Sequence, residues 1–397
     1  MVNYLIRRVF QMALVLFFSA LASYVLLNMA PGGPLVGLQQ SQRRLTSEDI
    51  ARISAYFELD IFVPFRFSRW LIGQPSGPVS IFGQAFGSNW VVGCRKPRTE
   101  QVLRPTGKYE TVTVGCQPGE AVTLAKLVGR QVSHGVLFGD FGNSWVITKG
   151  RPVANLLLSR LPYTLELMLL SYGISILIGV PLGVFSAIRQ YSVFDYTVTT
   201  GAFFGQSMPT FFFALLLILL FSITFQGLGW LYLPSGNALA PKPYSMPFLG
   251  QVQPGSVFDA VLHLIMPVTV LTLFNVAGWS RYIRTSMLEV LRQDYVRTAR
   301  AKGLQEQVVI AKHALRNALI PFITIVVFAI PGVFAGAILT ETVFNWPGMG
   351  RLYVQSLSQS DYPVAMAFLL IEAALTVIAT LVSDVLYSVA DPRIRLG

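Results

Sequence analysis

The sequence predicts an all-α polytopic membrane protein with six transmembrane helices. Two observations lead to this fold class. The composition is 53% hydrophobic and only 12% charged, whereas an ordinary soluble domain has roughly 25% charged residues. Several uncharged runs are also about 20 residues long, which matches the hydrocarbon layer of a bilayer. The net charge of +11 does not indicate nucleic-acid binding, because polytopic proteins keep Lys and Arg in their cytoplasmic loops for topological reasons.

Apolar runs place the six spans. The first is expected at Leu5 to Met29 and ends before "APGGP", because Pro31 to Pro34 cannot continue a helix. A cleaved signal peptide is the alternative, but the uncharged stretch from Val9 to Met29 exceeds the usual apolar region of about 7 to 15 residues. The other spans are expected at Pro162 to Ile188, Tyr196 to Phe225, Val261 to Ser280, Ala318 to Thr340, and Val364 to Val389.

The loop charges set the orientation. Residues 281–317 hold eight Arg or Lys against three acids, whereas the connection 345–362 holds Arg351 against Asp361. The basic loop is therefore expected in the cytoplasm. With six spans, both termini then face the cytoplasm. Basic residues at both ends agree with this orientation: Arg7, Arg8, Arg393 and Arg395.

Three regions follow from this topology. Residues 1–30 form an N-terminal span, residues 31–160 an extracytoplasmic segment, and residues 161–397 a five-span core with its cytoplasmic loop at about 281–317.

The extracytoplasmic segment contains a small insert at about residues 75–134. It is rich in Gly, Pro and Thr, and "KYETVTVGC" alternates as a strand does. Both cysteines of the chain, Cys94 and Cys116, lie here. Outside the cell they are expected to form a disulfide worth about 3 kcal/mol. Two independent buried thiols are the alternative.

The basic loop predicts a helix, a break and a second helix. In "DYVRTARAK", Asp294 is suited to N-capping, while Arg300 and Lys302 lie near the negative end of the helix dipole. Gly303 follows and favours a left-handed C′ conformation. The first helix is therefore short.

Periodicity in the second piece predicts two faces. The expected apolar stripe is Val308, Ala311, Leu315 and Leu319, and a basic face carries Lys312 and Arg316. From this pattern alone, a helix that lies on anionic lipid is an open alternative.

Several stretches resemble one family. "YVRTARAKGL" followed by "ALRNALIP" is similar to the cytoplasmic EAA loop of ABC importer permeases, in the form of the dipeptide, oligopeptide and nickel subfamily. Further similar stretches are "RLPYTLELMLLS", "SMPTFFFALLLILLFS", "ETVFNWPGMGRLYVQSLSQSDYPVAMAFLL" and "DPRIR". The likeness covers the first span and nearly everything from about Leu137 onward, and it implies a type I ABC importer permease-like fold.

Two departures accompany the resemblance. Where the general importer pattern has Glu followed by two alanines, this chain has Arg297, Thr298 and Ala299. The peptide-type subfamily shows the same replacement, so it is interpreted as subfamily character. The insert with Cys94 and Cys116 has no counterpart in the common shorter members.

The resemblance implies that the EAA loop forms a coupling helix that docks in a separate ATPase subunit. Tyr295 and Ala299 would offer an apolar contact, and Arg297 and Arg300 would face an acidic rim. Gly303 would let the chain turn. The expected coupling residues are Asp294, Tyr295, Arg297, Thr298, Ala299, Arg300, Gly303, His313, Leu315 and Arg316.

No catalytic residue, cofactor or metal is expected in the chain itself. The sequence has no GxxxxGK[ST] phosphate loop, so ATP and Mg are expected in partner subunits. The resemblance implies a homologous second permease, two ATPase subunits and an extracytoplasmic substrate-binding protein, in a prokaryotic inner membrane. The expected function is ATP-driven import of di- or oligopeptides by alternating access.

Other classes remain as alternatives. A secondary, ion-coupled transporter would need coupling residues near the midplane. A permease for nickel or another small solute is a further alternative, although His134, His263 and His313 are scattered along the chain. A membrane-embedded enzyme would need converging His, Asp or Cys residues, which the sequence does not offer.

Polar residues in the spans are candidates for the translocation path. Four acids lie in or near apolar segments: Glu166, Glu341, Glu372 and Asp384. Glu372, near the middle of the sixth span, either lines the passage or is protonated or paired for structure. Asn275 in the fourth span has the same two interpretations. Asp384 is expected to anchor a nearby arginine.

Overall fold

The computed structural model describes residues 2–29, 47–81, 84–103, 109–130 and 133–390. The expected helix break at Pro31 to Pro34 and the terminal Arg393 and Arg395 lie outside the described residues. The chain divides into two compact units. Unit 1 comprises Met1–Leu16, Leu158–Val354 and Ile371–Gly397, and unit 2 comprises Phe17–Leu157 and Gln355–Leu370.

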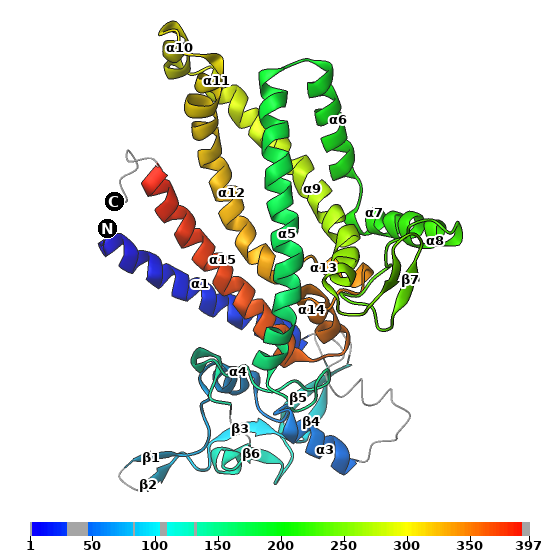
Figure 1. Cartoon of the computed structure of the whole chain (residues 1–397). Coiled ribbons are helices and arrows are strands. Elements are labelled where there is room, and N and C mark those ends of the chain that lie inside the picture. Colours follow the sequence, from blue (N-terminus) through cyan, green and yellow to red (C-terminus); the bar gives the residue numbers. More distant parts are fainter. Residues whose placement is uncertain (1, 30–46, 82–83, 104–108, 131–132, 391–397) are drawn as a thin grey trace. The chain divides into compact units, whose positions relative to one another are not determined.

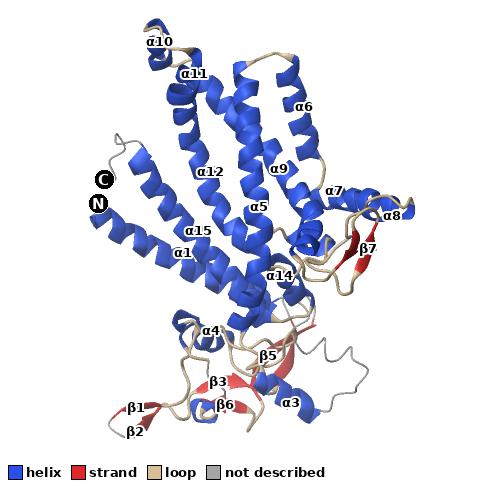
Figure 2. Ribbon diagram, in the orientation of Figure 1, coloured by secondary structure: helices blue, strands red, loops and turns tan. Residues whose placement is uncertain are grey.

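Helices long and apolar enough to cross a membrane dominate the chain (Figure 2). The described residues contain six such segments, which confirms the predicted fold class. They are Ile6–Met29, Val153–Ile188, Thr210–Gly227, Val257–Leu291, Glu306–Val343 and Tyr362–Leu386.

The third segment does not begin where the sequence predicted. A continuous helix was expected from Tyr196, but α6 (Val193–Ser207) and α7 (Thr210–Leu217) are separate. Met208 between them is extended, with φ −83° and ψ 125°. It precedes Pro209, and the proline ring disfavours helical geometry in the residue before it. The apolar helix continues through a π-helical segment, Ile218–Thr224, and α8 (Phe225–Gly227).

The fifth segment also differs from one simple helix. It begins with α11 (Glu306–Val308) and a π-helical segment (Val309–Leu315), and α12 (Arg316–Ala335) then continues. Gly336 ends α12 with φ +75°, a conformation that other residues rarely adopt. The apolar segment reaches past Thr340 as predicted, but the helix is interrupted at Gly336, and α13 (Ile338–Val343) is a separate short helix.

Two spans are longer than the apolar runs suggested. The second is α5 (Val153–Ile188) and the fourth is α9 (Val257–Leu291). Both contain prolines that the helix accommodates, as membrane helices often do. Together with α12 they pack around a buried cluster. Its members are Val184, Ala187, Trp279, Ile283, Met287, Ala314, Ala318 and Phe322.

The remaining elements of the core are short, apart from the last span. Strands β7 (Tyr244–Met246) and β8 (Gly250–Val252) form an antiparallel hairpin before α9. After α13 come α14 (Met349–Ser358) and α15 (Tyr362–Ala390). The predicted start of the last span at Val364 is two residues inside α15.

Unit 2 holds the stranded insert. Its helices include the second half of α1 (Val2–Met29), α3 (Ser47–Tyr56), α4 (Val63–Ile72) and the start of α15. The strands are β1 (Val79–Ile81), β2 (Gln84–Phe86), β3 (Val91–Cys94), β4 (Pro97–Leu103), β5 (Tyr109–Cys116) and β6 (Ala121–Thr123). They pair as β1–β2, β3–β6 and β4–β5, each antiparallel. Short 3-10 turns follow at Leu124–Leu127 and Val136–Phe138.

A disulfide joins two of these strand pairs. Cys94 and Cys116 are bonded, with their Cα atoms 5.7 Å apart. Cys94 ends β3, and Cys116 lies opposite Pro97 at the base of the β4–β5 hairpin. The bond therefore ties the β4–β5 hairpin to the β3–β6 pair.

Candidate functional site

The segment that links α9 to α12 carries the predicted coupling residues (Figure 1). Its first element is α10 (Asp294–Ala301). Asp294 was expected to be the N-cap, but the cap position is Gln293 and no side chain caps the helix. Asp294 is instead the first helical residue, where its charge still favours the positive end of the helix dipole.

Gly303 ends this helix as predicted, with φ +73°. Its N–H donates to the carbonyl of Arg300 at 2.9 Å, and the N–H of Leu304 donates to the carbonyl of Ala299 at 3.4 Å. This pair of bonds is a Schellman motif. A Cβ at Gly303 would meet nothing within 4 Å, so the left-handed conformation, and not crowding, favours glycine here.

A small apolar core holds α10 against the helix that follows. Val296 and Val309 are fully buried, and Ala299 is 5% exposed. Val290 and Leu291 at the end of α9 pack on this core. Ala299 was expected to contact a partner, and this role is wrong because its side chain faces inward. The segment that begins at Val309 packs against α10. Helical periodicity within each segment does not predict such a contact between them.

The exposed side of α10 is aromatic and basic. Tyr295 is 44% exposed, and Arg297 and Thr298 are also exposed. Arg297 lies 3.6 Å from Asp294, but both side chains are largely in solvent, so this ion pair is weak. Tyr295 and Arg297 are therefore the residues of α10 best placed to contact another protein.

Arg300 has a local partner. Its guanidinium Nη2 lies 2.7 Å from Oε1 of Glu306, across the turn at Gly303. The hydrogen bond to Glu306 raises the pKa of Arg300. This pair spans the turn and is less available to an outside acidic rim than Arg297 is.

The second piece of the loop is not a regular α-helix. Its π-helical turn changes the residue spacing. The predicted stripe is therefore wrong for Val308 and Ala311, which are exposed, but Leu315 and Leu319 pack on the apolar cluster as predicted. The predicted basic face is confirmed in part, because Lys312 and Arg316 are both exposed.

His313 and Leu315 have structural surroundings. Both side chains are half-buried, and Leu315 packs on the cluster shared by α5, α9 and α12. The carbonyl of His313 accepts a hydrogen bond from the amide of Asn317 at 2.7 Å. These residues support the segment and do not form its exposed face.

The loop is firmly attached to the spans next to it. The hydroxyl of Ser286 on α9 donates to the carbonyl of Ala318 on α12 at 3.0 Å. Further along α9, the guanidinium of Arg284 contacts both carboxylate oxygens of Asp195 on α6, at 2.6 and 2.7 Å. The last turns of α9, next to α10, are therefore bonded to both α6 and α12.

Asp195 was missed by the sequence reasoning. It is 2% exposed, and it also accepts hydrogen bonds from the Ser186 hydroxyl and from the N–H of Tyr191. The Arg284 guanidinium, helped by these donors, holds the pKa of Asp195 well below its usual range. One signal was available: Ser192 caps α6 by accepting from the Asp195 N–H, a capping pattern of Ser followed three residues later by an acid.

The acids inside the spans have different surroundings. Asp384 lies 2.5 Å from Arg8, as its predicted anchoring role requires. Glu341 is fully buried and accepts from the Thr164 hydroxyl at 3.0 Å and the Arg351 N–H at 2.9 Å. Glu341 therefore connects α5, α13 and α14. Glu166 is exposed.

The structure does not bring the two residues predicted for the translocation path into contact. Glu372 on α15 and Asn275 on α9 are both half-buried, and no contact between them is found in the described part of the chain. A cavity of about 410 Å³ lies instead beside the break between α6 and α7. Its lining, contributed by α5, α6, α7 and α9, is mostly apolar and includes Phe204, Met208 and Phe274, but neither path candidate. Groups of acids, cysteines and histidines that could hold a metal are absent from the described residues.

The six apolar spans and the basic segment between α9 and α12 define a polytopic membrane protein. Residues 179–396 match the family described as "Binding-protein-dependent transport system inner membrane component". The chain belongs to this family. Its members are permease components of ABC transporters and not themselves catalytic, and the chain is accordingly a multi-pass inner-membrane protein.

Curated relatives cover most of the chain. The oligopeptide transport system permease protein AppB of Bacillus subtilis is 44% identical over 71% of this chain and 82% of that protein. The di/tripeptide transport system permease protein DppB of Pseudomonas aeruginosa is 42% identical over 65% and 77%. The dipeptide transport system permease protein DppB of Escherichia coli K12 is 39% identical over 68% and 82%.

Proposed function

We propose that this permease moves di- or oligopeptides into the cell with energy from ATP hydrolysed in separate ATPase subunits. The relatives named for peptide transport support the cargo class. The observation that carries the energy coupling is α10, which exposes Tyr295 and Arg297 while its buried side packs on the end of α9 and on the π-helical segment that leads into α12. Such a helix can bind a partner on one face and move the spans with the other.

The proposed assembly contains a homologous second permease, two ATPase subunits and an extracytoplasmic substrate-binding protein. ATP and Mg bind in the ATPase subunits. Both termini and α10 face the cytoplasm in this arrangement, and the stranded insert faces outward. The basic character of residues 281–317 supports this orientation.

The proposed mechanism is alternating access. ATP-driven closure of the ATPases displaces α10, and the displacement reaches α12 through the shared core and α6 through the Arg284–Asp195 pair. The element has to be stiff, because a flexible loop would absorb the displacement. The Schellman turn at Gly303 and the Arg300–Glu306 pair supply that stiffness.

Substitution of Gly303 tests the coupling. We expect Gly303→Trp to leave membrane insertion intact and to abolish ATP-driven uptake of a labelled dipeptide by the reconstituted complex in proteoliposomes. Gly303→Asn is the matched control, since asparagine tolerates the left-handed conformation, and it should keep most of the uptake. Normal uptake by the Gly303→Trp variant would show that the turn at Gly303 is not needed for coupling.

The same vesicles separate ATP coupling from ion coupling. A protonophore should leave uptake unchanged while ATP is supplied. Uptake that stops with the protonophore, although ATP remains plentiful, would favour a secondary transporter.

A further inference from the structure

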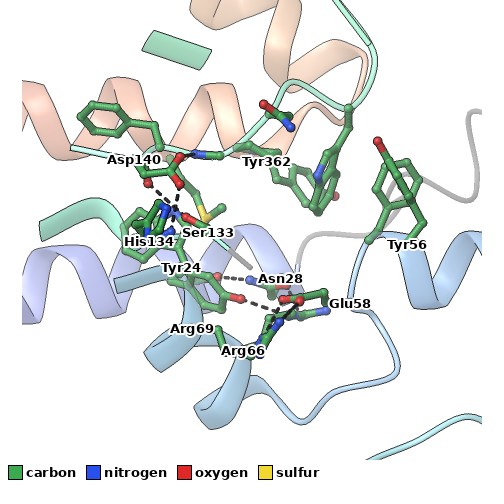
Figure 3. A pocket seen from close by; sticks show the side chains of 18 residues that line it. Tyr24, Asn28, Tyr56, Glu58, Arg66, Arg69, Ser133, His134, Asp140 and Tyr362 are labelled. Atoms are coloured by element: carbon green, nitrogen blue, oxygen red, sulfur yellow. Dashed lines mark hydrogen bonds and ion pairs between the residues drawn. The ribbon is translucent and has the colours of Figure 1, made fainter. Parts of the chain in front are cut away.

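Unit 2 contains a pocket that the proposed coupling mechanism does not use (Figure 3). Its volume is about 410 Å³, within the range of about 300 to 1,000 Å³ of small-molecule sites. The end of α1, the helix α4, the loop before α5 and the start of α15 all contribute to it. Aromatic side chains form much of the wall: Tyr24, Tyr56, Phe57, Trp70, Trp145 and Tyr362.

One wall carries a positive charge without an acidic partner. The Nε of Arg66 donates to the Tyr24 hydroxyl at 3.0 Å, and its Nη2 donates to the amide oxygen of Asn28. Both acceptors are neutral. Among the described residues, no carboxylate lies within ion-pair distance of Arg66, because the nearby Glu58 is held by Arg69.

Another wall carries a negative charge that no Lys or Arg pairs with among the described residues, although His134 lies beside it. The carboxylate of Asp140 accepts the N–H groups of His134 and Gly142, both at 2.9 Å. Burial alone would raise the pKa of Asp140, but these hydrogen bonds hold it below its usual value. Within the described chain, no Lys or Arg reaches ion-pair distance of Asp140. Arg66 lies on α4 and Asp140 in the loop before α5, so two different elements present opposite charges to one pocket (Figure 3).

The aromatic wall is held in place by a buried carboxylate. Asp361 is fully buried and accepts the Ser144 hydroxyl at 2.5 Å and the N–H of Trp145 at 2.9 Å. These bonds hold the backbone at Trp145, and its ring packs between Phe57 and Tyr362, with centroids 4.7 and 5.9 Å away. A wall that is rigid before binding lowers the entropy cost of binding.

We propose that this pocket binds a zwitterion that carries an anionic oxygen group and a primary ammonium. The oxygen group is held by the guanidinium of Arg66, and the ammonium donates to the carboxylate of Asp140. The aromatic rings cover the rest of the molecule and add cation–π attraction to the ammonium. Two sources share this chemistry: a short free peptide, which rests on the proposed function, and the headgroup of phosphatidylethanolamine.

Binding of a defined dipeptide tests the proposal without any transport. The full-length protein in phosphatidylcholine nanodiscs, without ATP or a binding protein, is titrated with Ala-Phe, N-acetyl-Ala-Phe and Ala-Phe amide. If a peptide is the ligand, Ala-Phe binds and each blocked analogue binds at least about tenfold more weakly, since each lacks one charge. Arg66→Gln and Asp140→Asn should weaken Ala-Phe binding by a similar factor. Arg98→Gln is the matched control, because Arg98 is an exposed arginine of the same unit outside the pocket.

A lipid arm separates the two sources. If the headgroup is the ligand, native mass spectrometry finds phosphatidylethanolamine retained by the wild type and by Arg98→Gln but lost from Arg66→Gln. Phosphatidylcholine, whose ammonium has no N–H to donate, should not be retained. The proposal is overturned if neither probe binds, or if the two pocket variants bind like the wild type. Intact ATP-driven uptake alongside absent binding would reject this site and leave the proposed function standing.

Discussion

The charged side chains of α10 are exposed to solvent, whereas three carboxylates elsewhere in the same protein are buried and hydrogen-bonded. On α10, Arg297 and Asp294 are mostly in solvent and 3.6 Å apart. By contrast, Asp195, Glu341 and Asp361 are at most 2% exposed and each accepts several hydrogen bonds. Exposed charge costs little and stays free to meet a partner, whereas a buried carboxylate is tolerated only when donors surround it.

The exposed charges are therefore suited to binding a partner, and the buried carboxylates to stabilising the fold. The buried carboxylates join segments distant in sequence: Asp195 meets Arg284 across 89 residues, and Glu341 meets Thr164 across 177. Loss of a buried carboxylate should therefore reduce stability, while loss of an exposed charge should leave stability nearly unchanged. The four predictions that follow test this contrast.

The largest effect is expected at Glu341. Glu341→Ala removes the acceptor of the Thr164 hydroxyl and of the Arg351 N–H and leaves a cavity. We expect a loss of about 3 kcal/mol in the free energy of unfolding, measured by thermal unfolding in detergent. Glu166→Ala is the matched control, an exposed acid on α5, and should change little. Equal melting temperatures for the two variants would contradict the stabilising role of Glu341.

A double-mutant cycle measures the Asp195–Arg284 pair. Asp195→Asn should lower stability by about 2 kcal/mol, less than for a fully buried pair, because the Arg284 side chain is 22% exposed and can be partly hydrated. Arg284→Met should cost a similar amount. The double variant should cost less than the sum, with a coupling energy of about 1 to 2 kcal/mol. Strict additivity would show that the two side chains act independently.

Acid should weaken the same pair. Because Arg284 lowers the pKa of Asp195 in the folded protein, the stabilisation is fully present above the unfolded value of about 3.9 and is lost as the pH falls toward the folded value. The melting-temperature gap between wild type and Asp195→Asn should therefore be constant from pH 7 to 5 and shrink below pH 4. A gap that widens in acid would reverse the sign of this linkage.

Local patterns were predictable from the sequence, and contacts between distant segments were not. The turn at Gly303 and the strand at Tyr109–Cys116 follow from neighbouring residues alone. The break at Met208 was missed although Pro209 was visible, because the apolar run continues across it. The inward direction of Ala299 depends on Val309 folding back onto α10. The sequence shows Asp195 and Asp361 but not their hydrogen-bond partners, because tertiary packing brings those partners from distant segments.

The smallest effect on stability is expected at the exposed Arg300–Glu306 pair. Both side chains are about half in solvent, and such pairs contribute about 0 to 1 kcal/mol. Glu306→Gln should therefore shift the unfolding free energy by no more than about 0.5 kcal/mol. If the pair stiffens the turn after α10 as proposed, the variant should still lose part of its uptake per ATP hydrolysed, measured as the ratio of the two rates in proteoliposomes. If the ratio is unchanged, the stiffness of the turn after α10 comes from Gly303 and the small apolar core alone. If the ratio falls while stability is unchanged, the exposed Glu306 carboxylate acts on coupling and not on stability.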